Sequence, residues 1–215
     1  MSYFIASYKG GRNESYMYGV DETTLWYDYD LISAYTTGMT LMGHPDYERS
    51  KMLDRKTLEK LPDVECVENY LVMAVKFKFP KKIKYPSIPC YANGLSIYPL
   101  EGEAVITGIE YMLARNQGCK FEEIKDIFMI PFQRDTNKDD RPLINQPFAS
   151  IIGNLQSERA KFDKGTLGNL MAKEKGNSIY GNVVKGMSNK KKFDIKSKRT
   201  VRMEASDLSN PILAS

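Results

Sequence analysis

The clearest hydrophobic pattern in the chain lies between residues 71 and 79. Apolar side chains alternate there with smaller or charged ones, in the order Leu71, Met73, Val75, Phe77, Phe79 against Val72, Ala74, Lys76, Lys78. A period of two residues predicts a strand with one apolar face. Three prolines follow, and they break the chain into turns: Pro80, Pro86 and Pro89.

A helix is predicted next. Thr107 is followed by Ile109, Met112 and Leu113 at helical spacing, so Thr107 is expected to cap a helix that ends near Gly118. Together with the strand and the turns, this helix makes residues 42–145 a small α+β subdomain.

A second apolar run, Leu25 to Ile32, reads LWYDYDLI. Its aromatic and branched residues predict a buried strand. Alternation places Asp28 and Asp30 on one face of that strand. A carboxylate in an apolar strand is costly to bury unless a cation or metal pairs with it, so Asp30 is expected to have such a partner.

Towards the C-terminus the pattern becomes helical. Pro147 suits the first turn of a helix with an apolar stripe formed by Phe148, Ile151, Ile152 and Leu155. The turn at residues 164–166 then reverses the chain into a second helix, which is expected to end at Gly181. On that helix Lys173, Asn177 and Tyr180 share one face, so an ammonium group, an amide and an aromatic ring point the same way.

Composition narrows the possible functions. The 215 residues, 42% apolar and 27% charged, suffice for one large domain or two small ones. No apolar run approaches the roughly 20 residues of a membrane span, and the start lacks signal-peptide features, so an intracellular protein that is not secreted is expected. Three separated cysteines and a single histidine give little support to a zinc site, a disulfide framework or a Ser-His or Cys-His hydrolase.

The positive charge is concentrated at the end of the chain. The last 33 residues carry 8 Lys and Arg against 3 Asp and Glu, whereas the first 182 carry 23 against 24. Such a segment is able to lie along a phosphate backbone, although a solvated hairpin explains it equally well. The basic residues are Lys185, Lys190, Lys191, Lys192, Lys196, Lys198, Arg199 and Arg202.

Near the N-terminus, Gly10 and Gly11 stand between Lys9 and Arg12. Paired glycines permit a tight turn and a close approach of backbone to a ligand, so a phosphate contact is plausible here. The pattern of a P-loop is absent, however, and a Gly-Gly turn is more often only a turn.

Three motifs together resemble family B DNA polymerases. The run K-x-x-x-N-S-x-Y-G at residues 173–181 resembles their fingers signature, D-x-x-S-x-Y at residues 30–35 resembles motif A, and Y-x-G-G at residues 8–11 resembles their template-contacting element. Thr36 stands where the family usually has proline. The runs G-L-x-x-Y-P-L-x-G-E at residues 94–103 and T-G-x-E at residues 107–110 resemble the insertion of the protein-primed subgroup found in phages and linear plasmids.

The resemblance implies roles for individual residues. Asp30 and the carbonyl of Leu31 would hold two Mg2+ ions, the amides of Ile32 and Ser33 would face the triphosphate, and Tyr35 would lie under the sugar and exclude a ribose hydroxyl. Lys173 would stabilise charge on the triphosphate, with Arg159 or Lys161 as a second contact and Asn177 and Tyr180 beside the nucleotide. DNA would be contacted by Tyr8, Lys9, Gly10, Gly11, Arg12, Ser178, Gly181, Lys190, Lys191 and Lys192.

The resemblance also implies an organisation. The chain would be an α+β fragment with part of a polymerase palm at residues 1–41, an insertion that binds the terminal protein at 42–145, a two-helix fingers hairpin at 146–182, and a basic segment returning to the palm at 183–215. Its partners would be primer-template DNA, deoxynucleoside triphosphates and a terminal priming protein, in the cytoplasm of the host cell.

One part of the polymerase pattern is missing. No Asp-Thr-Asp occurs in the 215 residues, so the isolated chain is expected to be inactive and to self-associate through an unpaired palm strand. Two other interpretations stay open: a non-catalytic module that binds nucleic acid or the priming protein, and an unrelated nucleotidyltransferase.

Overall fold

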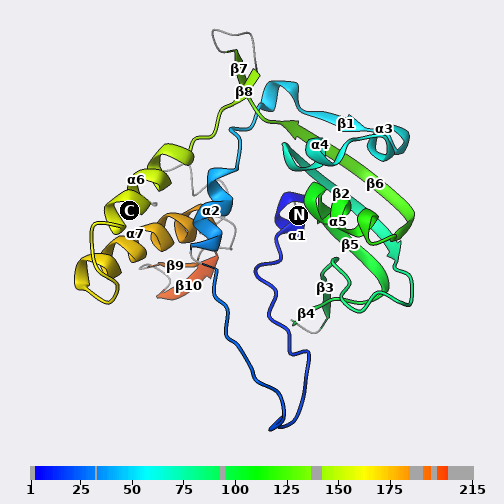
Figure 1. The fold of residues 1–215 in the computed structure, drawn as a ribbon. Helices are drawn as coiled ribbons and strands as arrows, with labels where there is room; N and C mark the ends of the chain where they lie inside the picture. Colours follow the sequence, from blue (N-terminus) through cyan, green and yellow to red (C-terminus); the bar gives the residue numbers. More distant parts are fainter. Residues whose placement is uncertain are drawn as a thin grey trace. The chain divides into compact units, whose positions relative to one another are not determined.

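The computed structural model describes residues 3–31, 33–92, 95–136, 142–184, 191–194 and 198–202 (Figure 1). The chain divides into two compact units, Met1–Ile151 and Ile152–Ser215, which are described separately below.

The first unit is built on a four-stranded antiparallel sheet of order β1-β6-β2-β5. Strand β2 is bonded on both edges, to β5 and to β6. This confirms the strand predicted at residues 71–79. The strands are β1 (Lys51–Leu53), β2 (Asn69–Lys78), β5 (Glu101–Thr107) and β6 (Lys120–Pro131).

One face of the sheet carries the main core, under helices α3 (Arg55–Glu59), α4 (Asp63–Val67) and α5 (Gly108–Asn116). Thr107 caps α5 as predicted, in a reciprocal capping box with Glu110. The helix buries Tyr111 and Ala114, whereas Ile109 and Leu113 are about half exposed. Of the residues that suggested the helix from the sequence, only Met112 packs against the core.

The opposite face of the sheet is covered by helix α1 (Tyr3–Ser7), which contacts β2 and β5 (Figure 1). Phe4 stacks edge-on against Phe128, with ring centres 5.6 Å apart, and the Tyr3 hydroxyl donates to the Asp126 carboxylate. Phe128 is partly buried and is paired with Val72, which is buried. Strand β2 is thus apolar on both faces in its first half, and not on one face as predicted, because α1 covers the second.

Shorter elements complete this unit. The proline-rich stretch at residues 79–89 contains no helix or strand, as predicted. Two small hairpins pair β3 with β4 and β7 with β8. These elements are α2 (Ala34–Thr40), the short helix η1 (Tyr47–Arg49), β3 (Cys90–Ala92), β4 (Leu95–Ile97), β7 (Arg134–Thr136) and β8 (Pro142–Ile144).

The predicted buried strand at residues 25–32 is not formed. Residues 25–31 belong to no helix or strand, and Trp26, Tyr29 and Leu31 are 61%, 87% and 80% exposed. A strand needs a neighbour to take up its backbone hydrogen bonds, and no described strand pairs with this segment. Asp28 and Asp30 are exposed to water, so the expected burial of Asp30 is wrong as well.

The second unit contains most of helix α6 (Ala149–Arg159), helix α7 (Leu167–Val184) and the antiparallel strands β9 (Lys191–Asp194) and β10 (Arg199–Arg202). Residues 160–166 reverse the chain between the helices, as predicted. Gly165 has φ +91 there, but Gly181 has no positive φ. Gly181 therefore does not end the helix, which continues to Val184; the predicted end was wrong because a glycine stops a helix most readily in the left-handed conformation.

The start of α6 also differs from the prediction. Pro147 lies in a turn two residues before the helix. Ile152 of the predicted apolar stripe is 1% exposed, but Ile151 is 49% exposed. In the described ranges, no helix is both long and apolar enough to cross a membrane.

Replacing Gly108 tests the packing of α5 on β2. A Cβ at this position would lie 2.6 Å from the Cys66 carbonyl oxygen and 2.9 Å from the Leu71 Cβ. Overpacking against backbone costs about 2 kcal/mol, so Gly108→Ala is expected to lower the free energy of unfolding by that amount in a denaturant titration. The control is Ile109→Ala in the same helix, which should cost less than about 1 kcal/mol. Equal stability of the two variants would contradict the packing.

Candidate functional site

Helix α7 brings three of the predicted residues to one side of the second unit. It runs without a break from Leu167 to Val184, so Lys173, Asn177 and Tyr180, at spacings of four and three residues, lie along one face. Lys173 and Asn177 are exposed and Tyr180 is partly buried. Ser178 and Gly181 are also exposed. A charged ligand can therefore reach the ammonium group and the amide from solvent.

The turn between α6 and α7 is closed by Asn169. Its side-chain nitrogen donates to the carbonyl oxygens of Phe162 at 3.2 Å and Arg159 at 3.4 Å, and its oxygen accepts from Arg159 Nε at 3.4 Å. Lys175 also pairs with Glu158 across the helices at 3.5 Å. Arg159 thus helps to hold the hairpin together, whereas Lys161 is exposed in the connection.

A second group of predicted residues meets in the first unit. A Cβ added to Gly11 would lie 2.7 Å from the Tyr35 hydroxyl oxygen. The Y-x-G-G turn and the D-x-x-S-x-Y motif, which are 24 residues apart at these positions, are therefore in direct contact. Tyr35 is in the first turn of α2 and is 57% exposed.

The residues around Tyr35 give α2 an unusual start. Ser33 precedes the helix with φ 56, a left-handed conformation that non-glycine residues adopt infrequently. Thr36 is buried and its hydroxyl donates to the Ser33 carbonyl at 3.0 Å. Leu31 is exposed, and Ile32 lies outside the described residues.

The two cations beside the Gly-Gly turn are engaged within the protein. The Arg12 guanidinium lies 3.8 Å above the Tyr98 ring, donates to the Pro86 carbonyl at 2.9 Å and pairs with Glu14. The Lys9 ammonium group lies 4.9 Å from the Tyr91 ring centre and also donates to the Ala6 carbonyl. Tyr8 is 43% exposed.

Only some of the basic residues of the C-terminal segment are among the described residues. Lys191 and Lys192 lie in β9, which pairs with β10 in the hairpin arrangement that the sequence left open. Lys190 lies outside the described residues.

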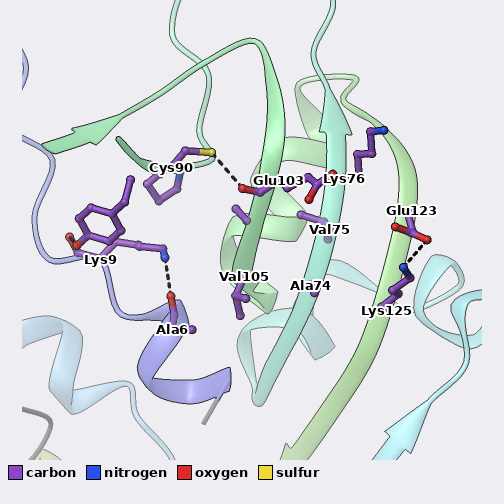
Figure 2. Close-up of a pocket in the computed structure, with 13 residues that line it drawn as sticks. Ala6, Lys9, Ala74, Val75, Lys76, Cys90, Glu103, Val105, Glu123 and Lys125 are labelled. Carbon is purple, nitrogen blue, oxygen red and sulfur yellow. Dashed lines mark hydrogen bonds and ion pairs between the residues drawn. The ribbon is translucent and has the colours of Figure 1, made fainter. Parts of the chain in front are cut away.

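A hollow of about 480 Å³ lies between α1, β3 and the second face of the sheet (Figure 2). Its floor includes Ala74 and Val105, and its rim carries both signs of charge, for example Lys76 and Glu103. Cys90 also lines it; burial raises the pKa of this thiol, which donates to the Glu103 carbonyl at 3.6 Å. Among the predicted site residues that the structure describes, only Lys9 lines the hollow. The hollow is therefore separate from the contact between Gly11 and Tyr35.

The described residues do not form a site for two magnesium ions. Asp30 and Asp28 are exposed in a segment without secondary structure, and the described part of the chain holds no cluster of three or more His, Cys, Asp or Glu side chains suited to a metal. Mg2+ requires near-octahedral oxygen coordination, and two adjacent ions require several carboxylate oxygens. These conditions are not met by Asp30 and the Leu31 carbonyl alone.

Sequence reasoning missed three residues that shape these sites: Tyr91, Tyr98 and Asn169. Tyr98 belongs to a quoted motif, but its contact with Arg12 spans 86 positions and no periodicity reveals it. Asn169 follows the turn glycine closely, and an asparagine near a helix start is a recognisable signal for local hydrogen bonding.

Comparison with known proteins relates nearly the whole chain to one segment of a DNA polymerase. The relative is the Primer-independent DNA polymerase PolB of Escherichia coli, 33% identical over 211 residues, which are 98% of this chain and 23% of that protein. The chain thus spans about a quarter of the relative's length. No known protein-family profile matches.

Two solved structures are also similar. One is Phi29 DNA polymerase complexed with primer-template DNA and incoming nucleotides, with a TM-score of 0.49, 14% identity, and coverage of 81% of this chain and 30% of that one. An orthorhombic crystal form of Phi29 DNA polymerase has a TM-score of 0.48 and 14% identity, and covers 77% of this chain and 28% of that one.

The exposed placement of Asp30 predicts weak magnesium binding by the isolated 215-residue chain. Titration calorimetry with Mg2+ should give no saturable heat, because Asp30 belongs to no cluster of three or more metal-ligating side chains among the described residues. The Asp30→Asn variant should give the same trace. A saturable isotherm that disappears in Asp30→Asn would show that the ligand set is complete.

Proposed function

We propose that these 215 residues are the nucleotide-handling segment of a family B DNA polymerase of the protein-primed type. The observation that carries the proposal is the 33% identity with a DNA polymerase over 98% of the chain. The placement of Lys173, Asn177 and Tyr180 on one face of α7 supports it, because the resemblance of the sequence to the fingers motif depends on these residues.

In this proposal the face of α7 receives the incoming deoxynucleoside triphosphate. The Lys173 ammonium group offsets negative charge on the phosphates, where a preorganised cation is most effective as charge develops during the reaction. Asn177 and Tyr180 offer an amide and a ring to the base and sugar. Lys161, exposed in the α6–α7 connection, is the better candidate for a second phosphate contact, since Arg159 helps to close the hairpin.

Tyr35 is proposed to select the sugar. Its ring is partly exposed and its hydroxyl group abuts Gly11, so its position is restricted from the side of the turn. A ring held in a fixed place beneath C2′ of the nucleotide excludes the additional hydroxyl of a ribonucleotide by steric clash. The Ser33 amide, with Ile32 beside it, is proposed to face the triphosphate.

Two magnesium ions would stabilise the attacking and leaving oxygens of the transferred phosphate. Asp30 and the Leu31 carbonyl are the proposed ligands from this chain. Because the described residues do not complete the coordination, further carboxylates are required for activity.

The proposed organisation follows the motifs. Residues 1–41 contribute to the palm, 42–145 form the insertion, 146–182 form the fingers and 183–215 return to the palm. Template DNA is proposed to meet the turn of Tyr8, Lys9, Gly10 and Gly11, and also Ser178, Gly181 and the basic residues Lys190–Lys192. The insertion is proposed to contact a terminal priming protein. The relative is called primer-independent, so synthesis from template alone is a second mode of initiation to test.

A second candidate function is a non-catalytic module that binds nucleic acid or the priming protein. Such a module would need no Asp-Thr-Asp motif, and the 215 residues contain none. An unrelated nucleotidyltransferase is less well supported, because the relative is a DNA polymerase.

Nucleotide incorporation distinguishes the candidates. The gene product that contains residues 1–215 should incorporate labelled deoxynucleotides on a DNA template with Mg2+. The Asp30→Asn variant should abolish incorporation, whereas the control Asp28→Asn, also exposed, should retain most of it. The isolated 215-residue chain should extend no primer. A gene product that binds DNA in a salt-dependent way but never incorporates nucleotide would favour the module.

The role of Lys173 is tested in the same gene product. Lys173→Ala should raise the apparent KM for deoxynucleotides about tenfold and slow incorporation, as loss of one charged contact to the triphosphate does. Lys175→Ala is the matched control, because Lys175 lies on the same helix and pairs with Glu158. Equal nucleotide kinetics in the two variants would remove Lys173 from the site.

A further inference from the structure

The turn that touches Tyr35 and the residues after it contact four residues far away in the sequence: Tyr85, Pro86, Tyr91 and Tyr98. On one side of the turn, Arg12 stacks on Tyr98 with 3.8 Å between the guanidinium carbon and the ring centre. Its Nη1 donates to the Pro86 carbonyl at 2.9 Å, and its Nε donates to Glu14 at 2.7 Å. These contacts use both the flat face and the edge of the guanidinium.

On the other side of the turn, Tyr91 of β3 holds Lys9. The Tyr91 hydroxyl donates to the Lys9 carbonyl at 3.3 Å, and the Lys9 ammonium lies 4.9 Å from the centre of the same ring. Farther along, Tyr16 packs edge-on against Tyr85, with ring centres 4.9 Å apart. The segment from Lys9 to Tyr16 is therefore anchored at successive points on Tyr91, Tyr98, Pro86 and Tyr85.

Between the two anchors, the turn has little freedom. Gly10 has φ +70, a conformation that other residues adopt only with strain. Gly11 faces the Tyr35 hydroxyl so closely that a Cβ would lie 2.7 Å from it. A displacement of Arg12 or Lys9 therefore moves Gly11, which contacts the Tyr35 hydroxyl group.

We infer that Arg12 is a positioning residue, through which Pro86 and Tyr98 set the Gly10–Gly11 turn and thereby the Tyr35 ring. Discrimination between deoxyribonucleotides and ribonucleotides then depends on Arg12 and Tyr98, although neither touches the nucleotide. This inference rests on the proposed function of Tyr35. It replaces the phosphate contact expected of Arg12 from the sequence, because the guanidinium is already stacked and hydrogen-bonded within the protein.

Arg12→Lys separates the two roles of this cation. Lysine keeps the charge but has no planar face to stack on Tyr98 and no fork of donors. In the complete gene product, Arg12→Lys should raise the ratio of ribonucleotide to deoxynucleotide incorporation about tenfold, the factor expected for loss of an ordinary cation–π contact with a hydrogen bond. Tyr98→Leu removes only the cation–π contact and should raise the ratio by a smaller factor. Hydrogen exchange of amides 9–12 should become faster. The control is Arg55→Lys, because Arg55 also donates to backbone carbonyls. This variant should change neither the incorporation ratio nor the hydrogen exchange of amides 9–12.

Gly11→Ala approaches the same contact from the other side. The added methyl group should displace the Tyr35 hydroxyl and change the incorporation ratio, and the double variant Gly11→Ala/Tyr35→Phe should restore it, because removal of the hydroxyl makes room while the ring is kept. Gly38→Ala in α2, where a Cβ meets nothing within 4 Å, is the matched control and should behave like the wild type.

The incorporation ratios of the variants show whether the inference fails alone or together with the proposed function of Tyr35. If Tyr35→Val raises the ratio but Arg12→Lys does not, the positioning role is wrong and the proposed function of Tyr35 stands. If Tyr35→Val leaves the ratio unchanged, both are wrong. A wild-type ratio in Arg12→Lys, combined with weaker salt-dependent DNA binding in Arg12→Leu, would return Arg12 to the phosphate contact.

Discussion

The first unit depends on the position of strand β2 between β5 and β6. Both edges of β2 are hydrogen-bonded, and Leu71, Val72 and Met73 are all buried in succession. A strand with two apolar faces must be covered on both sides, because apolar side chains left exposed to water lower the stability of the fold. Helices α3, α4 and α5 cover one face, and the N-terminal helix α1 covers the other.

The packing of α1 on the sheet also affects the position of the Gly10–Gly11 turn. Because α1 is fixed on the sheet, the chain that leaves it passes β3 and the residues before it, where Arg12 meets Tyr98 and Pro86. The Gly-Gly turn is thus attached to the same body as the insertion. A motif that the sequence assigns to the palm is held by contacts with a different proposed subdomain.

The elements that could be predicted are those with local causes. The strand at residues 71–79 and the helix cap at Thr107 each depend on neighbouring residues, and both are confirmed. The strand at residues 25–32 was predicted from the same kind of pattern but is wrong, because a strand depends on a partner, and a run such as LWYDYDLI does not encode where that partner is. Gly181 failed as a helix end for a related reason: a glycine permits a stop without requiring one.

In the candidate site, too, the features with local causes could be predicted from the sequence, and the contacts between distant residues could not. The shared face of Lys173, Asn177 and Tyr180 follows from helical periodicity, so the sequence was sufficient to find it. The contact between Gly11 and Tyr35 joins two motifs that were recognised separately, but their contact depends on the path of the chain between them. Arg12 shows the limit most clearly: as a cation beside two glycines it suggested a phosphate contact, while in the structure its planar face lies on Tyr98.

The open segment before α2 also gives the protein a spectroscopic property. Trp26 is the only tryptophan in the chain, and it is 61% exposed, whereas the aromatic residues of the sheet core are tyrosine and phenylalanine. Indole fluorescence therefore originates in this segment alone and has the red-shifted emission of a solvated ring. Any molecule that covers the segment beside Asp28 and Asp30 would shift that emission to the blue without contribution from the folded sheet.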